Sequence, residues 1–290
     1  MVALQSSVAA CFVGSDTVLR LSGSDHRDWL QGQISQDVRK LSSENSVSTC
    51  FLSATGQLQA IARLHDQGDA ILIVTGQPDV VEARVRDFVI MEDVEVETLS
   101  RGLWTLHGMQ AEEGVRDLKV GRHDRTAWPG YDLLEGELAG LSGVEEPSVV
   151  QLDALGLEAG IPKFGVDTSA KTLPPELGKA FEAATISYTK GCYLGQEVVM
   201  RIYSRGHVNR LWIGIRLSAP VESGSEVTWE GKAVGTVMRA VLLGEGEFLA
   251  AAMVRMEAAE PGSAVTITGV SGTVASLPLT LEKRAAVQLD

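Results

Sequence analysis

The segment from Ile186 to Glu197 concentrates chemically reactive side chains. It reads Ile-Ser-Tyr-Thr-Lys-Gly-Cys-Tyr-Leu-Gly-Gln-Glu and so contains a thiol, an ammonium group, two glycines and an adjacent amide and carboxylate. Lys190 close to Cys192, and a helix expected to begin near Gly195, would both favour the thiolate form of the cysteine. Cys192 is therefore a candidate nucleophile or metal ligand, although a free cysteine can also be a small buried apolar residue.

The same part of the chain is locally basic. Residues 189–210 contain four basic side chains and one acidic side chain, namely Lys190, Arg201, Arg205, Arg210 and Glu197. Their sum of +3 contrasts with the net charge of −13 for the whole chain. This contrast suits a pocket for an anion, but it also suits a solvated face on which Arg201 pairs with Glu197 one helical turn away.

Composition indicates an ordinary globular chain without a metal site of its own. The 290 residues are 44% hydrophobic and 22% charged. Cys11, Cys50 and Cys192 are too few and too widely spaced for a disulfide scaffold, so reduced thiols are expected. Cys11 and Cys50 lie in apolar runs and are predicted to be buried. No C-x-x-C motif, leader-like start or long apolar run is present, so we expect a cytoplasmic location and no membrane contact.

The elements that position this segment can be predicted from periodicity. Before residue 111 the pattern predicts a strand, a short helix that carries Trp29 and ends at Gly32, a hairpin, a further strand, an amphipathic helix and two strands. These elements are expected at 11–21, 24–32, 48–52, 57–64, 69–74, 78–91, 94–99 and 103–106. Residues 111–147 are interpreted as loops and short strands.

The second half is predicted to hold helices and then a small β-domain. Ser148 is a suitable cap for a helix over 149–158 that stops at Gly160, and a proline-bearing irregular connection follows over 161–179. Beyond Arg210, short alternating segments separated by glycine-bearing turns are typical of a barrel or sandwich. The expected strands are 211–217, 226–229, 233–242, 247–253 and 264–267.

The run from Lys190 to Glu197 resembles the K-G-C-Y-x-G-Q-E signature of YgfZ-type proteins, a branch of the glycine-cleavage T-protein superfamily. Further matches follow in family order and span almost the whole chain. They are Leu30-Gln31-Gly32-Gln33, Asp37, Glu158-Ala159-Gly160-Ile161-Pro162 and Leu173-Pro174-Pro175-Glu176-Leu177.

The resemblance implies an α+β, T-protein-like fold with two α+β lobes and a C-terminal β-barrel around a central channel. The corresponding division places residues 1–45 and 146–210 in the first lobe, residues 46–145 in the second lobe, and residues 211–290 in the barrel.

The resemblance also implies a site for tetrahydrofolate or a derivative. By similarity to T-proteins, Glu158 is expected to accept paired hydrogen bonds from the aminopyrimidine edge of the pterin. The other expected folate-binding residues are Tyr193, Gln196, Arg201 and Trp29, and the expected catalytic residues are Cys192 and Lys190. The chain departs from the superfamily at Gln57 and Gln59, where T-proteins carry an acidic pair, and at Gly156, where many relatives carry an arginine.

The function implied by the resemblance is that of a folate-binding accessory protein for iron–sulfur cluster assembly or repair, which indirectly supports tRNA modification. Its expected partners are reduced folate and iron–sulfur client or scaffold proteins, with a cluster shared transiently through Cys192. The alternative is a folate-dependent aminomethyl or one-carbon transferase. A Cys–His hydrolase that uses Cys192 with His207 is a third hypothesis. Direct tRNA binding rests only on the +3 patch and conflicts with the total charge, so no direct nucleic-acid contact is expected.

Overall fold

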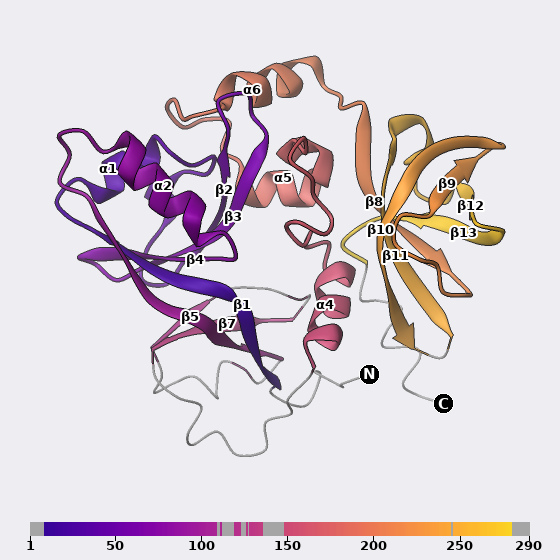
Figure 1. Ribbon diagram of the computed structural model, residues 1–290, viewed down its shortest axis with the longest axis horizontal. Coiled ribbons are helices and arrows are strands. Elements are labelled where there is room, and N and C mark those ends of the chain that lie inside the picture. Colours follow the sequence, from indigo (N-terminus) through magenta and orange to yellow (C-terminus); the bar gives the residue numbers. More distant parts are fainter. Residues whose placement is uncertain are drawn as a thin grey trace.

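The computed structural model describes residues 9–108, 111, 119–122, 126, 128–135, 148–244 and 246–279. Figure 1 shows a sheet and its helices on one side of the molecule and a barrel on the other side. Helix α4 (Val149–Glu158) lies between the sheet and the barrel. The loops and short strands predicted over 111–147 fall largely outside the described residues. Within that range, β6 (Lys119–Arg122) and β7 (Gly130–Glu135) are strands.

One seven-stranded sheet runs through the first part of the molecule, in the order β2-β3-β4-β1-β5-β7-β6. Its central strand β1 (Ala9–Ser22) pairs antiparallel with β4 and β5. Val18 and Leu19 are both buried, and since successive side chains point to opposite faces, both faces of the sheet are covered there. The remaining strands are β2 (Val47–Leu52), β3 (Leu58–Asp66), β4 (Ala70–Thr75) and β5 (Glu95–His107).

The sheet is strongly curled. Arg63 on β3 places its Nε 3.0 Å from Oδ2 of Asp132 on β7, and its guanidinium also pairs with Asp16. Strands β3 and β7 are four positions apart in the sheet, a separation of about 19 Å in a flat sheet. The ion pair can form only because the sheet bends into a half-barrel that brings these strands together.

Two helices cover the sheet, where α1 (His26–Gln31) contacts β4 and α2 (Pro78–Phe88) contacts β5. In α1, Trp29 and Leu30 are buried, and Gly32 ends the helix. Helix α2 begins with proline, whose fixed backbone angle suits a first turn, and buries Val81. These residues share one hydrophobic core with the inner face of the sheet.

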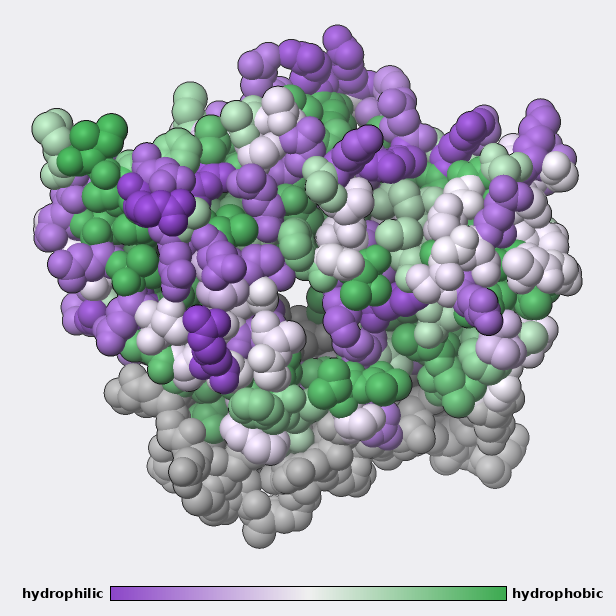
Figure 2. All heavy atoms as spheres, in the orientation of Figure 1, coloured by the Kyte–Doolittle hydropathy of each residue, from purple (hydrophilic) through white to green (hydrophobic). Residues whose placement is uncertain are grey.

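The segments after α4 connect the two parts. They are the 3₁₀ turn η2 (Pro174–Leu177), α5 (Lys179–Thr185) and α6 (Gln196–Arg205). Helix α5 packs on β2, while η2 contacts α5, α6 and the first barrel strand β8. Helix α4 contacts β1 as well as β10 and β11 of the barrel. Figure 2 shows an opening near the centre of the molecule, between these parts.

The barrel closes in the order β10-β11-β8-β13-β12-β9 around its own hydrophobic core. Close packing at Gly235 requires glycine, because a Cβ atom there would lie 2.3 Å from the carbonyl oxygen of Met253. The strands are β8 (Arg210–Leu217), β9 (Glu226–Trp229), β10 (Lys232–Gly244), β11 (Glu247–Arg255), β12 (Ala264–Ile267) and β13 (Val270–Ala275), with the 3₁₀ turn η3 (Met256–Ala258) after β11.

Most predicted elements are confirmed, with three differences, of which one is α5 (Lys179–Thr185), a helix that the sequence analysis did not predict. The two strands predicted over 94–99 and 103–106 are one strand, because Gly102 at φ +88° lets β5 continue through an irregularity. Strand β13 was not predicted. The division into lobes stays a prediction, although β1 belongs to the same sheet as the strands assigned to the other lobe. None of the described helices is long and apolar enough to cross a membrane.

Candidate functional site

The loop from Ile186 to Gly195 connects α5 to α6 and is fixed to the turn after α1. The amide of Ser187 donates to the carbonyl of Ser35 at 2.9 Å, and the amide of Leu194 donates to that of Gly32 at 3.2 Å. Gly195 has φ +85°, and a Cβ there would lie 2.4 Å from the carbonyl oxygen of Ser53. The backbones of Gly195 and Ser53 thus approach each other closely where α6 begins, which explains why the second glycine of the motif is needed.

Lys190 is the internal anchor of this loop. Its Nζ donates to the carbonyl oxygens of Gln31, Ile34 and Gln36 at 2.6, 2.7 and 2.9 Å, and the residue is 6% exposed. Burial lowers the pKa of Lys190 from 10.5 to about 8, so the group is still mainly an ammonium at neutral pH. Its three protons are directed at backbone oxygens, which gives Lys190 a structural task. Its catalytic role stays a prediction.

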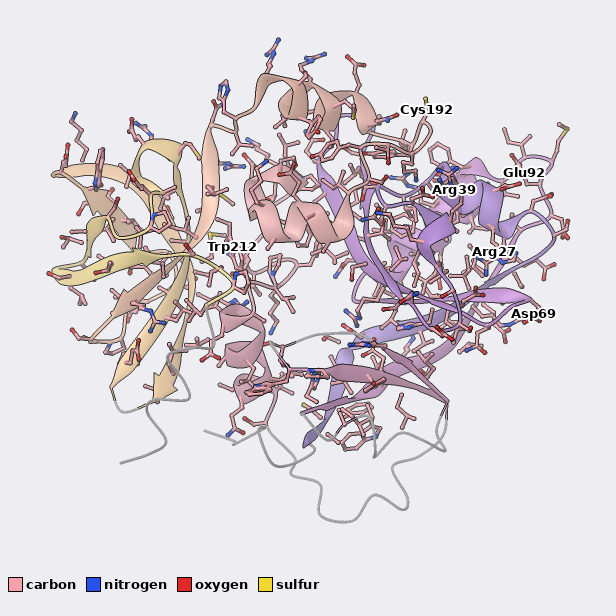
Figure 3. The ribbon with its side chains drawn as sticks, turned by 180° about the vertical axis from the view of Figure 1, so that it is seen from behind. Arg27, Arg39, Asp69, Glu92, Cys192 and Trp212 are labelled. Atoms are coloured by element: carbon pink, nitrogen blue, oxygen red, sulfur yellow. The ribbon has the colours of Figure 1, made fainter. Side chains whose placement is uncertain are left out.

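Cys192 is the exposed cysteine among the three, as Figure 3 shows at the outer edge of the molecule, while Cys11 and Cys50 are buried. Burial raises the pKa of Cys50 to about 12, which keeps it a thiol. The possibility that Cys192 is a core residue is therefore wrong, and the prediction that Cys11 and Cys50 are buried is confirmed. Of the three, Cys192 is the thiol that reagents and partners can reach.

Cys192 lies in an open hollow of about 690 Å³, hereafter the Cys192 hollow. The loop supplies Cys192 to Gly195, and α6 supplies Gln196, Glu197 and Met200. The facing wall consists of Gly32, Gln33, Ala54 and Phe88. Three predicted site residues, Cys192, Tyr193 and Gln196, are thus brought together.

The aromatic residues near the hollow serve mainly as its walls and support. Tyr193 is buried, its ring lies 5.1 Å from Nζ of Lys190, and burial raises its pKa. Trp29 is buried behind the wall, where its Nε1 donates to the carbonyl of Phe88 at 3.3 Å. Trp29 therefore positions Phe88 and is not among the residues that line the hollow.

A second buried cation, which the sequence analysis did not single out, lies behind the opposite wall. Arg84 is 4% exposed and donates to Oε1 of Gln59 at 2.6 Å, to the carbonyl of Leu52, and more weakly to Gln33. Its guanidinium carbon lies 5.4 Å from the centre of the Phe88 ring. Within the described ranges no carboxylate forms an ion pair with Arg84 or Lys190. The hollow is consequently flanked by two cations that meet only neutral oxygens.

The first turns of α6 hold the remaining predicted residues of this segment. Gln196 begins the helix, and no side chain caps this end. Arg201 donates to Oε1 of Glu197 at 2.6 Å on the exposed side of the helix and is not among the residues that line the hollow. The predicted i,i+4 pair is therefore present.

His207 follows the far end of α6, where its Nδ1 lies 3.3 Å from the carbonyl of Arg205. The ten-residue helix, about 15 Å long, separates it along the chain from the loop that carries Cys192. This placement gives no support to a Cys–His hydrolase.

Glu158 lies elsewhere, at the end of α4. It is 6% exposed, and its carbonyl accepts a hydrogen bond of 2.7 Å from the amide of Leu279. Gly160, two residues further on, lines a second hollow of about 390 Å³ between the barrel, η2 and α5. This hollow is also lined by Trp212, a buried residue whose Nε1 has no hydrogen-bond partner in the described structure. Figure 3 shows Trp212 and Cys192 well separated.

Trp212 was missed in the sequence because it lies in an alternating apolar strand that looks like ordinary core. A buried donor without an acceptor costs about 1–3 kcal/mol, so it is a plausible contact for a ligand oxygen.

The two glutamines that replace the acidic pair of T-proteins have local partners. Oε1 of Gln57 accepts hydrogen bonds from Ser53 and Thr55, and Gln59 accepts from Arg84. Neither side chain can act as a carboxylate base. Over the part of the chain that the structure describes, no cluster of three or more potential metal ligands is found.

Comparisons with known proteins add independent information. No protein-family model matches the chain. The tRNA-modifying protein YgfZ of Yersinia pestis (strain Pestoides F) is 25% identical over 297 residues, covering 90% of this chain and 89% of the relative. A putative chloroplastic transferase of Arabidopsis thaliana is 26% identical over 296 residues, covering 90% and 68% of the two chains.

The fold is shared with a solved structure. The glycine cleavage system aminomethyltransferase T from Bartonella henselae superimposes with a TM-score of 0.80 at 20% identity, covering 96% of this chain and 87% of that chain. The α+β, T-protein-like fold with a C-terminal barrel is thereby confirmed. The chain is thus similar in sequence to a YgfZ protein over nine-tenths of its length and shares its fold with a glycine-cleavage aminomethyltransferase.

Proposed function

We propose that this protein is a folate-binding accessory protein that acts in the cytosol in iron–sulfur cluster assembly or repair and thereby supports tRNA modification. The observation that carries the proposal is the exposed thiol of Cys192, held in a rigid loop between two buried cations. Negatively charged groups are favoured in such a hollow. A thiolate and a cluster bound by thiolates both carry negative charge. In this role Cys192 would hold a cluster only transiently, together with ligands from a client or scaffold protein.

The chain offers suitable groups for a reduced folate near the end of α4. Glu158 provides a buried carboxylate, which suits the paired donors of an aminopyrimidine edge. The adjoining hollow of about 390 Å³ has the size of a small-molecule site, and Trp212 offers one donor without a partner. A bound reduced folate would supply a carrier of one-carbon units. Glu158 would orient it, and Trp212 would donate to one of its oxygens.

The transferase alternative is less well supported by the residues present. Gln57 and Gln59 stand where T-proteins carry acidic side chains, so the chain lacks the carboxylates that could orient or protonate the folate nitrogen. Turnover of tetrahydrofolate with a methylamine-type donor would reverse this preference.

The folate part of the proposal is tested by calorimetric titration with 5-formyltetrahydrofolate. Glu158→Gln keeps the size of the side chain but removes its charge, and should weaken binding by about 1–3 kcal/mol because ligand donors lose their charged acceptor. Glu226→Gln on the exposed edge of β9 is the control and should bind like the wild type. Equal affinity of Glu158→Gln and the wild type would remove Glu158 from the site.

The cluster part is tested with Cys192→Ala in cells that depend on this protein. The variant should melt within about 2 °C of the wild type, since an exposed side chain contributes little to the core, yet lose support for a cluster-dependent enzyme. Glu197→Gln, at the rim of the same hollow, should retain that support. Full enzyme activity with Cys192→Ala would refute the role of the thiol.

A further inference from the structure

An unusually apolar tip projects beside the Cys192 hollow. It consists of Phe88 to Met91 and is hereafter the apolar tip. Phe88, Ile90 and Met91 are 43%, 86% and 93% exposed. Val89 between them is partly buried against the core of the sheet. Clustered exposed apolar side chains are unfavourable in water and usually mark an interaction surface.

The backbone of the apolar tip is fixed by local hydrogen bonds. The carboxylate of Glu92 accepts from the amides of Ile90 and Met91 at 2.9 and 3.1 Å. The following residue is tied to the start of α1, since the amide of Asp93 donates to Asp25 at 2.8 Å and the amide of Ser24 donates to Asp93 at 2.7 Å. The apolar side chains are therefore presented on a preorganised loop, which reduces the entropy lost on binding.

The rim of the tip is acidic. Asp25, Asp87, Glu92 and Asp93 surround it, and the exposed cation next to it, Arg86, is already paired with Asp87 at 2.8 Å. The cation against the Phe88 ring, Arg84, is buried. Backbone amides hold the pKa of Glu92 below its usual value, with the amide of Ile90 as the main cause, so this carboxylate is ionised at neutral pH. Insertion into an anionic membrane would bring these carboxylates against lipid phosphates, which repel them. The rim instead complements lysine and arginine side chains.

From the rigid apolar tip and its acidic rim, we propose that this edge of the molecule docks a partner protein through an apolar pocket bordered by basic residues. Phe88 belongs both to the tip and to the wall of the Cys192 hollow, so a protein seated on the tip also faces the thiol. Figure 3 shows Glu92 and Cys192 on the same outer edge, away from the barrel. This docking surface rests on the accessory role proposed above. It adds the surface on which the partner protein would sit.

The test uses site-specific photocrosslinking in living cells. Replacing Met91 with p-benzoylphenylalanine places the reactive group at the tip. The same replacement at Leu242, 58% exposed on barrel strand β10, is the matched control. The proposal requires a protein adduct at position 91 that is absent at position 242. The identified partner, once purified, should bind the wild type in calorimetry, and the double variant Ile90→Asp, Met91→Asp should bind at least about tenfold more weakly.

Other outcomes overturn the proposal. They are an adduct only with a second copy of this chain, Met91-dependent binding to phosphatidylglycerol vesicles, the absence of any adduct specific to position 91, and unchanged affinity of the double variant. Folate titration and thermal melting of the same variants should match the wild type. Because these two readouts do not involve the tip, a failure of folate binding in the wild type counts against the proposed function and not against the docking surface.

Discussion

Cations with little solvent exposure are neutralised differently in two regions of the molecule. At the junction of barrel and α4, Arg239 lies 2.9 Å from Asp167, whose side chain is fully buried, and donates further to the carbonyls of Asp153 and Ile161. Beside the Cys192 hollow, Lys190 and Arg84 are even less accessible than Arg239 but donate to neutral oxygens. The junction is therefore balanced in charge, whereas the two cations behind the hollow have no ion-pair partner within the described residues.

This difference separates structural from functional use of a buried charge. A paired cation fixes one part of a molecule against another but offers little to a ligand. A cation whose partners are only neutral oxygens still attracts an anion. Its burial costs desolvation free energy, and such costs are common at functional sites. The contrast is consistent with the role proposed for Cys192 and with Arg239 as an anchor of the barrel.

The largest effect should follow from breaking the balanced pair. Arg239→Met leaves the carboxylate of Asp167 buried without its partner, so the free energy of unfolding should fall by about 3–5 kcal/mol. Denaturant titration measures this loss. The double variant Arg239→Met, Asp167→Leu removes both charges and should recover a large part of the stability. A single variant as stable as the wild type would abolish the distinction between the two regions.

Removing the cation beneath the hollow should cost less. Lys190→Met leaves three carbonyl groups without a donor but no unpaired charge, and it relieves the desolvation of the ammonium, so we expect a loss of about 2 kcal/mol. Lys232→Met, at an exposed position of β10 and without an ion pair within the described residues, is the control and should change little. If Lys190→Met lost as much stability as Arg239→Met, Lys190 would be better described as half of an ion pair.

The third prediction concerns the reactivity of the three thiols, where the expected effect on stability is the smallest. At pH 8, an aromatic disulfide reagent should label one thiol of the folded protein, namely Cys192, and all three after unfolding. Raising the pH to 10 should still leave Cys50 unlabelled. The pKa of Cys50 in the folded state, about 12, lies above the unfolded value of 9.0, so folding keeps this thiol protonated. The stability that the thiol contributes is fully present below pH 9 and is lost progressively as the pH rises from 9 toward 12.

The labelling experiment has a direct control. Cys192→Ala should show no labelling in the folded state and two labelled thiols after unfolding. Rapid labelling of Cys50 in the native protein at pH 8 would contradict the assignment of the hollow as the reactive region.

Local patterns were sufficient to predict most of the elements. Strands β9 and β12 were predicted at their observed bounds, because short alternating segments end at glycine-bearing turns. Strand β13 (Val270–Ala275) was missed because its sequence, Val-Ser-Gly-Thr-Val-Ala, is small and polar. It is a strand because β8 and β12 pair with it on either side, which is information that a single segment does not contain.

The sequence motif indicated which residues lie together at the candidate site, but not how their side chains are oriented. The motif singled out Cys192, but the exposure of this thiol depends on how the loop turns at Gly195. Lys190 was expected to act on the thiol, while its side chain enters the turn that follows α1. Arg84 was not considered, because an arginine in an amphipathic helix normally faces solvent. Its burial follows from acceptors on separate segments, Leu52 and Gln59.

The hydrogen bond from Leu279 to Glu158 also constrains how the protein is made. A ribosome produces α4 long before the barrel strands, so the end of α4 first emerges without the segment that later covers it. Gly160 is likewise packed against Pro278 only after β13 has been synthesised. The surroundings of Glu158 are therefore completed at a late stage of translation. A nascent chain that stalls within the barrel would display the signature loop while still lacking the finished Glu158 environment.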